Sequence, residues 1–263
     1  SLDYAIIFCN HFKEEHETLP LKEAVIESLA KSIPEISSSS LTTIGGLVAM
    51  LFMQFKIGPD MGICLIKAIA FALLGEDESK AAAATLNQMV IENGCHLNTG
   101  FLSTPFLCDV LAKYGYADTA YKLLLQPDAP GWLYEVNMGA TTIWERWNSV
   151  NPDGKISGIG INSMNHYAYG AVFEWVYKNV CGLNPVPDVP GYKKAVIRPQ
   201  PDVRLGAAKA RVNTAAGYYE TGWQYEDNGE VTYTVVIPFD AEAEVYLPKK
   251  DGTTEEMTLT AGT

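Results

Sequence analysis

The 263-residue chain has few of the residues that disulfide, metal or nucleic-acid chemistry would need. It contains five cysteines, an odd number, without a Cys-x-x-Cys pair, and only four scattered histidines. We therefore expect no metal site, and the simplest prediction is buried free thiols in a reducing, cytoplasmic compartment. Basic residues are also scarce, because 19 Lys and Arg stand against 31 Asp and Glu, for a formal net charge of -12. A nucleic-acid-binding surface would be basic, so nucleic acid is not an expected partner.

Long apolar runs and a leader sequence are missing as well. The strongly apolar segment 41–55 has 15 residues, fewer than the roughly 20 that span a membrane, so a buried helix is expected and a membrane partner is not. No secretory signal opens the chain. Residue 1 falls inside an expected helix, which is typical of a piece cut from a larger protein. Hydrophobic residues make up 48% of the chain, enough for a sizeable core.

The first part of the chain follows the helical period. Apolar positions recur every three or four residues in a series of segments, which are 2–33 (two helices), 41–55, 61–74, 79–92, 106–114, 116–125 and 164–179. Asp77, Asp118 and Asn162 precede or open three of these segments and are expected to begin helices there. Residues 141–147 are expected to form a helical turn. Helix follows helix without strand alternation, as in an α-toroid.

The pattern changes after Cys181. Residues 182–191 hold three prolines, which is typical of a domain edge. Beyond them the apolar period becomes two, as in 231–237 and 243–247, and Asp-Asn-Gly and Asp-Gly turns follow the hairpin pattern. We therefore predict two domains, a helical one at 1–183 and a small antiparallel β-sandwich at 184–263.

The stretch Trp132–Trp147 carries the most suggestive chemistry. It holds three of the five tryptophans and places Glu145 between Trp144 and Arg146. Indole rings stack on the C–H faces of a sugar, and a carboxylate can move protons at a glycosidic bond. A buried aromatic cluster with a structural Glu–Arg pair would explain the same pattern, so the chemistry alone leaves both interpretations open.

Three motifs together resemble the bacterial α-L-rhamnosidases of glycoside hydrolase family 78. They are Asn98–Phe101, Gly139–Trp147 and Asn162–Gly170, and the resemblance covers about residues 85–250. It implies a mainly α fold followed by β, with part of an (α/α)6 barrel before a C-terminal β-sandwich. It also implies inverting hydrolysis that releases terminal α-L-rhamnose from a glycoside or oligosaccharide, without a cofactor.

The resemblance assigns roles to individual residues. The family's catalytic base falls on Glu145, its sugar-contacting histidine on His166 and a stacking tryptophan on Trp132. The neighbouring residues Trp144, Arg146 and Asn165 are expected to bind substrate. Arg146 could either orient Glu145 or contact a sugar hydroxyl. Taken alone, His166 would more often be structural, and the resemblance favours the sugar contact.

The general acid of the family has no counterpart here. Its acidic motif lies farther upstream of the base than the 144 residues available, and Asp3, Glu14, Glu15 and Glu17 look like solvated charges. We therefore expect about half a barrel, inactive in isolation, whose exposed apolar faces could pair in a homodimer. Two other hypotheses stay open, namely a non-catalytic carbohydrate-binding or interaction module and an α-toroid glycosidase for another sugar.

Overall fold

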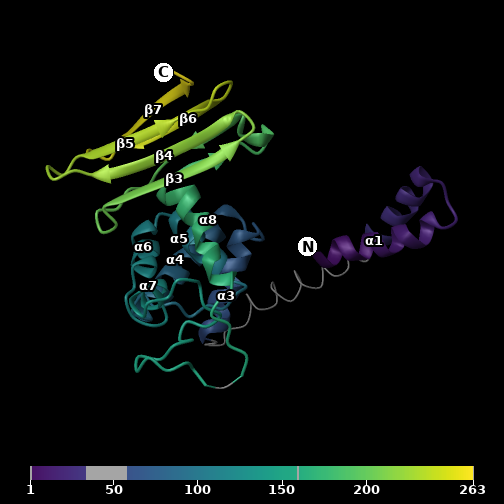
Figure 1. Cartoon of the computed structure of the whole chain (residues 1–263), viewed down its shortest axis with the longest axis horizontal. Helices are drawn as coiled ribbons and strands as arrows, with labels where there is room; N and C mark the ends of the chain where they lie inside the picture. Colours follow the sequence, from purple (N-terminus) through teal and green to yellow (C-terminus); the bar gives the residue numbers. More distant parts are fainter. Residues whose placement is uncertain (1, 34–57, 159, 263) are drawn as a thin grey trace. The chain divides into compact units, whose positions relative to one another are not determined.

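The computed structural model describes residues 2–33, 58–158 and 160–262 (Figure 1). The expected helix at 41–55 lies outside these residues. The chain divides into two compact units, Ser1–Gly58 and Pro59–Thr263, which are described separately. Within the described ranges, every helix is too short or too polar to cross a membrane.

The first unit contains the two predicted helices, α1 (Leu2–His16) and a helix over residues 21–33. Ala24 is fully buried, as the periodicity predicted. Ile26 and Ile33 are instead 56% and 57% exposed, so the expected apolar stripe is only partly buried.

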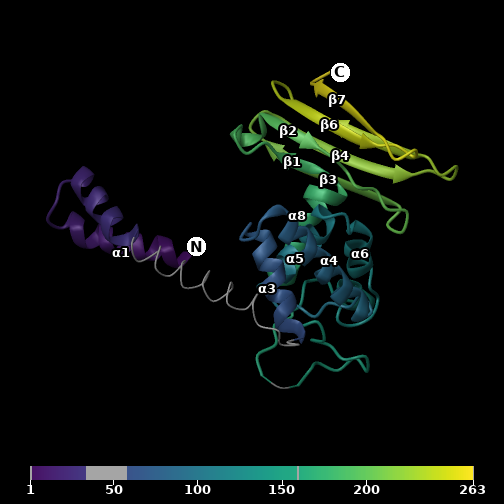
Figure 2. The same ribbon diagram turned by 180° about the vertical axis from the view of Figure 1, so that it is seen from behind.

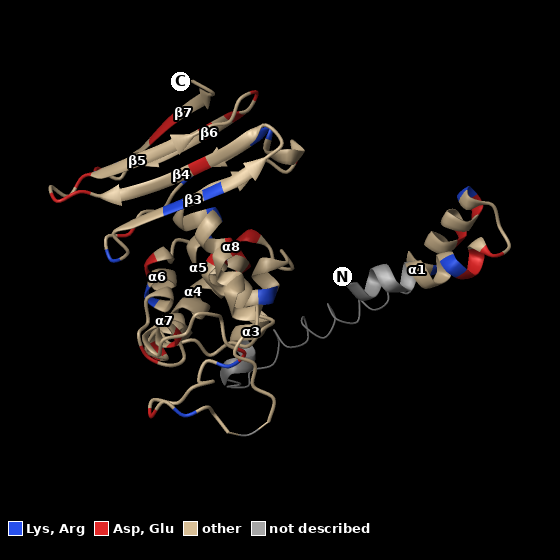
Figure 3. Ribbon diagram, viewed as in Figure 1, with Lys and Arg blue, Asp and Glu red and all other residues tan. Residues whose placement is uncertain are grey.

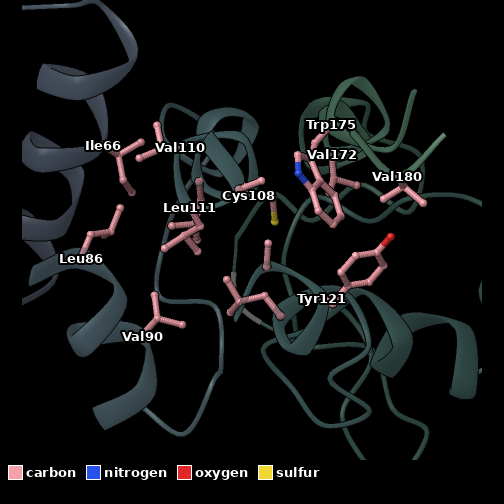
Figure 4. Packing of buried hydrophobic residues seen from close by; sticks show 14 of the residues in the cluster. Ile66, Leu86, Val90, Cys108, Val110, Leu111, Tyr121, Val172, Trp175 and Val180 are labelled. Atoms are coloured by element: carbon pink, nitrogen blue, oxygen red, sulfur yellow. The ribbon is translucent and has the colours of Figure 1, made fainter. Parts of the chain in front are cut away.

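The second unit begins with a helical part. Its elements are α3 (Gly58–Ala70), α4 (Glu76–Glu92), α5 (Thr104–Lys113), α6 (Ala117–Leu124), α7 (Trp132–Asn137) and α8 (Val172–Trp175), the last flanked by the helical turns η1 (Ala168–Ala171) and η2 (Val176–Val180). They pack around one apolar core (Figure 4). Ile66, Leu111 and Trp175 each expose 0% of their surface there, and Trp175 meets the Tyr121 ring edge-on at 5.3 Å. Each helix contributes one apolar stripe, as the period of 3.6 requires.

The expected start of α4 was wrong. Asp77 does not cap the helix, because Gly75 holds that position and the helix begins at Glu76. Asp77 lies instead in the first turn with Glu76 and Glu78. Three carboxylates there interact favourably with the partial positive charge of the helix N-terminus.

The second part of this unit consists of two β-sheets. One sheet has the order β1 (Leu183–Pro185), β2 (Lys194–Ile197), β6 (Glu242–Pro248), β7 (Thr254–Thr260), and the other has the order β3 (Ala207–Thr214), β4 (Gly217–Tyr225), β5 (Val231–Val236). A second apolar core is formed mainly by Ala195, Ile197, Tyr219, Ala243 and Val245. In Figure 3, basic residues on β3 lie beside an acidic residue on β4, where Lys209 and Glu220 form a 2.7 Å ion pair.

The mainly α, then β fold class is confirmed, with one difference in the sheets. The predicted turns at 227–229 and 251–252 join antiparallel pairs, β4 with β5 and β6 with β7. The pair β2–β6 is parallel, however. The two strands are separated by the whole β3–β5 sheet, so local alternation carries no information about their relative direction.

The chain passes from helix to strand at Gly182. Its φ is +77°, and a Cβ atom there would lie 2.1 Å from the nitrogen of Pro199, so only glycine fits. Next to this junction, β4 docks on the end of the η2 turn, where the Trp223 indole N–H donates to the carbonyl of Val180 at 2.6 Å. Trp223 is 3% exposed, so it is a core residue at this junction. The sheets thus lie at one end of the helical part (Figures 1 and 2).

Candidate functional site

Two segments of irregular chain come together at the end of the helical part opposite the sheets (Figures 1 and 2). The amide of Glu145 donates to the carbonyl of Ser163 at 2.9 Å, and the amide of His166 donates to the carbonyl of Ile143 at 2.8 Å. The Thr142 hydroxyl adds a 2.5 Å bond to the carbonyl of Met164. The motifs that carry Glu145 and His166 are therefore held side by side.

This pairing replaces the local structure that the sequence predicted. Residues 141–147 form bends and turns, not a helical turn. The helix expected from residue 164 begins only at Ala168. Asn162 does not cap it, because its side chain accepts a 2.6 Å bond from the Ser149 hydroxyl and donates to the Ser149 carbonyl. These bonds were not predictable, since Ser149 lies 13 residues before Asn162, beyond the reach of a local capping pattern.

Glu145 is half-buried, with one carboxylate oxygen engaged. Its Oε2 accepts a 2.6 Å bond from the amide of Ser163. A backbone N–H that donates to a carboxylate fixes its orientation. With Oε2 held in this way, Oε1 can contact water or substrate.

Arg146 and Asn165 belong to the two paired segments, one to each. The Arg146 guanidinium donates to the carbonyl of Ile161 at 2.7 Å, and its amide donates to the Ser149 hydroxyl. Asn165 is exposed, and its amide donates to the hydroxyl of Ser163 at 3.2 Å. Both residues shape the chain around Glu145, and their predicted contacts with substrate remain predictions.

The His166 ring has a defined orientation. It stacks with Phe101, at 4.7 Å between ring centres and 16° between planes, and with Tyr167, at 5.5 Å and 6°. Its Nδ1 accepts a 3.3 Å bond from the amide of Ala168. A neutral imidazole that accepts at Nδ1 carries its proton on Nε2, so Nε2 can donate to a sugar hydroxyl.

The predicted sugar-binding tryptophans lie behind this surface. Trp132 is 6% exposed, and its indole N–H donates to the carbonyl of Tyr169 at 3.0 Å. It meets Trp147 edge-on at 5.4 Å, and Trp147 stacks on the Tyr169 ring at 3.7 Å. Trp144 is 4% exposed. The aromatic cluster is therefore mainly core in this structure, and sugar stacking on Trp132 or Trp144 stays a prediction.

One carboxyl group of the site was missed from the sequence. Glu135 on α7 is 2% exposed, and its Oε2 accepts a 3.1 Å bond from the amide of Trp144. Burial raises the pKa of Glu135 to about 7, although that bond acts in the opposite direction. Burial also raises the pKa of the Tyr169 hydroxyl, and the charges of Glu135 and Glu145 raise it further. The spacing held a signal, since Glu135 follows Trp132 by three residues and shares its helix face.

The second unit matches two domain families over almost its whole length. Residues 57–180 match the bacterial alpha-L-rhamnosidase 6 hairpin glycosidase domain, and residues 182–261 match the bacterial alpha-L-rhamnosidase C-terminal domain. The helical part and the β-domain that follows it therefore correspond to the six-hairpin domain and the C-terminal domain of one family. The chain belongs to the bacterial α-L-rhamnosidase family.

Individual relatives agree with this placement. The chain is 39% identical over 191 residues to an α-L-rhamnosidase of Alteromonas sp. (strain LOR), covering 73% of this chain and 20% of that protein. It is 41% identical over 227 residues to one of Formosa agariphila, covering 86% and 23%. The chain thus spans about a fifth to a quarter of the length of these curated relatives.

Two solved structures are also similar. The Streptomyces avermitilis α-L-rhamnosidase complexed with L-rhamnose superimposes with a TM-score of 0.70 at 35% identity, covering 76% of this chain and 21% of that one. The native α-L-rhamnosidase of Aspergillus terreus gives a TM-score of 0.73 at 27% identity, covering 91% and 28%.

A different family matches the start of the chain. Residues 1–75 match the MMPL family, and this match overlaps the six-hairpin match over residues 57–75. The overlap contains α3, whose Ile66 and Ile69 belong to the core of the second unit.

Proposed function

We propose that the chain supplies the C-terminal part of the catalytic toroid and the following β-domain of an inverting α-L-rhamnosidase. The observation that carries the proposal is the pairing of Glu145 and His166 on two bonded segments. The relatives named as α-L-rhamnosidases, one of them solved with L-rhamnose, support the same substrate.

In this proposal Glu145 is the general base. Its carboxylate takes a proton from a water molecule, which attacks the anomeric carbon on the face opposite the leaving group. A second, protonated carboxyl group, roughly 6.5–9.5 Å away in inverting enzymes, donates to the leaving oxygen. The Ser163 amide holds the Glu145 carboxylate in place. The Nε2–H of His166 binds a sugar hydroxyl, and Trp132, Trp144, Arg146 and Asn165 shape the subsite.

The domain division belongs to the same proposal. We place the boundary at residues 183/184, one residue into β1 and next to Gly182, whose positive φ suits only glycine. Apolar side chains such as Phe71 and Phe173, each 57% exposed, are surfaces that a homodimer or further toroid helices would cover. The five free thiols favour a reducing, cytoplasmic location.

The isolated 263-residue chain is expected to be inactive on an aryl α-L-rhamnoside, because the general acid of the family has no counterpart here. The full-length product of the gene is expected to hydrolyse the same substrate with inversion. Release of the chromophore measures the rate, and ¹H NMR of the first product anomer gives the stereochemistry. Robust turnover by the isolated chain would mean that it contains the acid, and a retained anomer would contradict the mechanism.

The same assay separates the two alternatives. A non-catalytic carbohydrate-binding module would bind L-rhamnose while even the full-length product hydrolysed nothing. A toroid glycosidase for another sugar would reject the rhamnoside but hydrolyse another member of an aryl-glycoside panel.

Replacing His166 with alanine in the full-length product is expected to weaken L-rhamnose binding about tenfold, the loss of roughly one hydrogen bond. The ring is half-buried and its removal leaves the 143–166 backbone bond in place. Calorimetric titration with L-rhamnose measures the change. His96→Ala, a half-buried histidine outside the two paired segments, is the control. Equal L-rhamnose affinities for wild type and His166→Ala would show that His166 does not contact the sugar.

A further inference from the structure

Glu135 has a position that the reaction scheme above does not use. It lies in α7, a helix of six residues, three positions after Trp132. With 2% of its surface exposed, it is among the largest fully buried side chains of the described residues. A buried carboxyl group in an otherwise apolar cluster normally reduces stability unless it is fully hydrogen-bonded.

Its hydrogen bonds lead to the chain segment that carries Glu145. The side-chain Oε2 accepts the amide of Trp144 at 3.1 Å, and the backbone carbonyl accepts the amide of Ala140 at 3.0 Å. Trp144 directly precedes Glu145, whose own amide and carboxylate are bonded to Ser163. Glu145 is therefore held from two sides, by Glu135 through its neighbour and by Ser163 directly.

The second oxygen of Glu135 is unusual. Within the described residues, Oε1 is buried without a hydrogen-bond partner. A buried polar atom without a partner reduces stability, so a leucine of similar volume would suit a purely structural role better. The burial also prevents Glu135 from reaching a glycosidic oxygen, so it is not the missing general acid. What remains is its contact with the backbone beside Glu145.

We propose that Glu135 is a positioning residue that holds the Trp144–Glu145 backbone in the orientation in which the Glu145 carboxylate faces the attacking water. The inference rests on the proposed function, since it assigns Glu135 a task only if Glu145 is the base. A displacement of about 1 Å at such a group can lower a rate about 100-fold.

The test compares Glu135→Gln with Glu135→Leu in the full-length product. Glutamine keeps an oxygen that accepts the Trp144 amide, so kcat is expected within about threefold of wild type. Leucine fills the space without an acceptor, so kcat is expected to fall about 10- to 100-fold while KM changes less than about threefold, because the sugar contacts of His166 remain. Asn137→Ala, an exposed residue on the same helix, serves as the matched control and should leave both constants unchanged.

The outcomes are separable from those of the proposed function. Near-normal kcat in Glu135→Leu, or an equal loss in Glu135→Gln, would overturn the positioning role. Normal turnover of Glu145→Gln would instead show that Glu145 is not the general base. Hydrogen exchange of the Trp144 amide in the isolated 263-residue chain provides a measurement that does not depend on catalytic activity. It should accelerate at least tenfold in Glu135→Leu but not in Glu135→Gln, and unchanged exchange in the leucine variant would also overturn the proposal.

Discussion

The Glu145→Gln variant of the full-length product is expected to hydrolyse rhamnosides about 10³-fold more slowly than wild type, within the range that general-base catalysis contributes. Glutamine cannot take a proton from water at neutral pH. Its side-chain oxygen can still accept the 2.6 Å bond from the Ser163 amide, so the group should stay in place. The loss should therefore appear in kcat, corresponding to about 4 kcal/mol of transition-state stabilisation.

Binding provides the complementary measurement. L-rhamnose affinity, measured by calorimetry, should change less than about threefold in Glu145→Gln, because the hydrogen-bonded framework of the two segments is intact. Asp153→Asn is a suitable control, since it removes a negative charge from the exposed loop between the paired segments. Near-normal turnover of both Glu145→Gln and Asp153→Asn would contradict the role of Glu145 as general base.

The second large effect concerns stability and pH. Burial raises the pKa of Glu135 from 4.5 to about 7. Between these values the unfolded chain has lost the proton while the folded chain retains it, so the folded state binds more protons and its stability falls as pH rises. Ionisation of Glu135 therefore lowers the unfolding free energy by on the order of 3 kcal/mol at pH 8, and this destabilisation is absent below about pH 4.

The Glu135→Gln variant lacks this titration. We expect the difference in unfolding free energy between wild type and Glu135→Gln to shift by about 3 kcal/mol against wild type from pH 4 to pH 8. Urea unfolding followed by tryptophan fluorescence suits the measurement, since all five tryptophans lie in the second unit.

An exposed glutamate provides the control for this experiment. The Glu174 side chain is 61% exposed in an ion pair with Lys178, so Glu174→Gln should change stability by less than about 1 kcal/mol at every pH. Other groups titrate in both proteins and cancel in the difference. Parallel stability curves for wild type and Glu135→Gln would show that Glu135 titrates normally.

Much of the secondary structure could be predicted because it depends on local patterns. The period of 3.6 places Ile66, Leu111 and Trp175 in the core, and alternation places Ala243 and Val245 between the sheets. The hairpin turns at 227–229 and 251–252 were equally local, since their glycines adopt a positive φ.

Apart from the start of α4, where the cap is Gly75 and not Asp77, the errors fall where a residue's partner lies outside its own local segment. Asn162 looked like a helix cap, but its side chain bonds Ser149. Residues 141–147 looked helical, but the amide of Glu145 and the carbonyl of Ile143 bond Ser163 and His166. The parallel pairing of β2 with β6 has the same cause, because strand direction across a long connection leaves no local trace.

The candidate site divides in the same way. The sequence by itself determined the family motifs, and with them the choice of Glu145 and His166, because those residues keep their spacing within short recognisable segments. Only the tertiary structure decided that Trp132 and Trp144 are buried, that Nδ1 of His166 accepts a backbone bond, and that Glu135 is a buried acid bonded to the amide of Trp144, next to Glu145. Burial, tautomer and pKa depend on which groups surround a side chain, and those groups are assembled by folding.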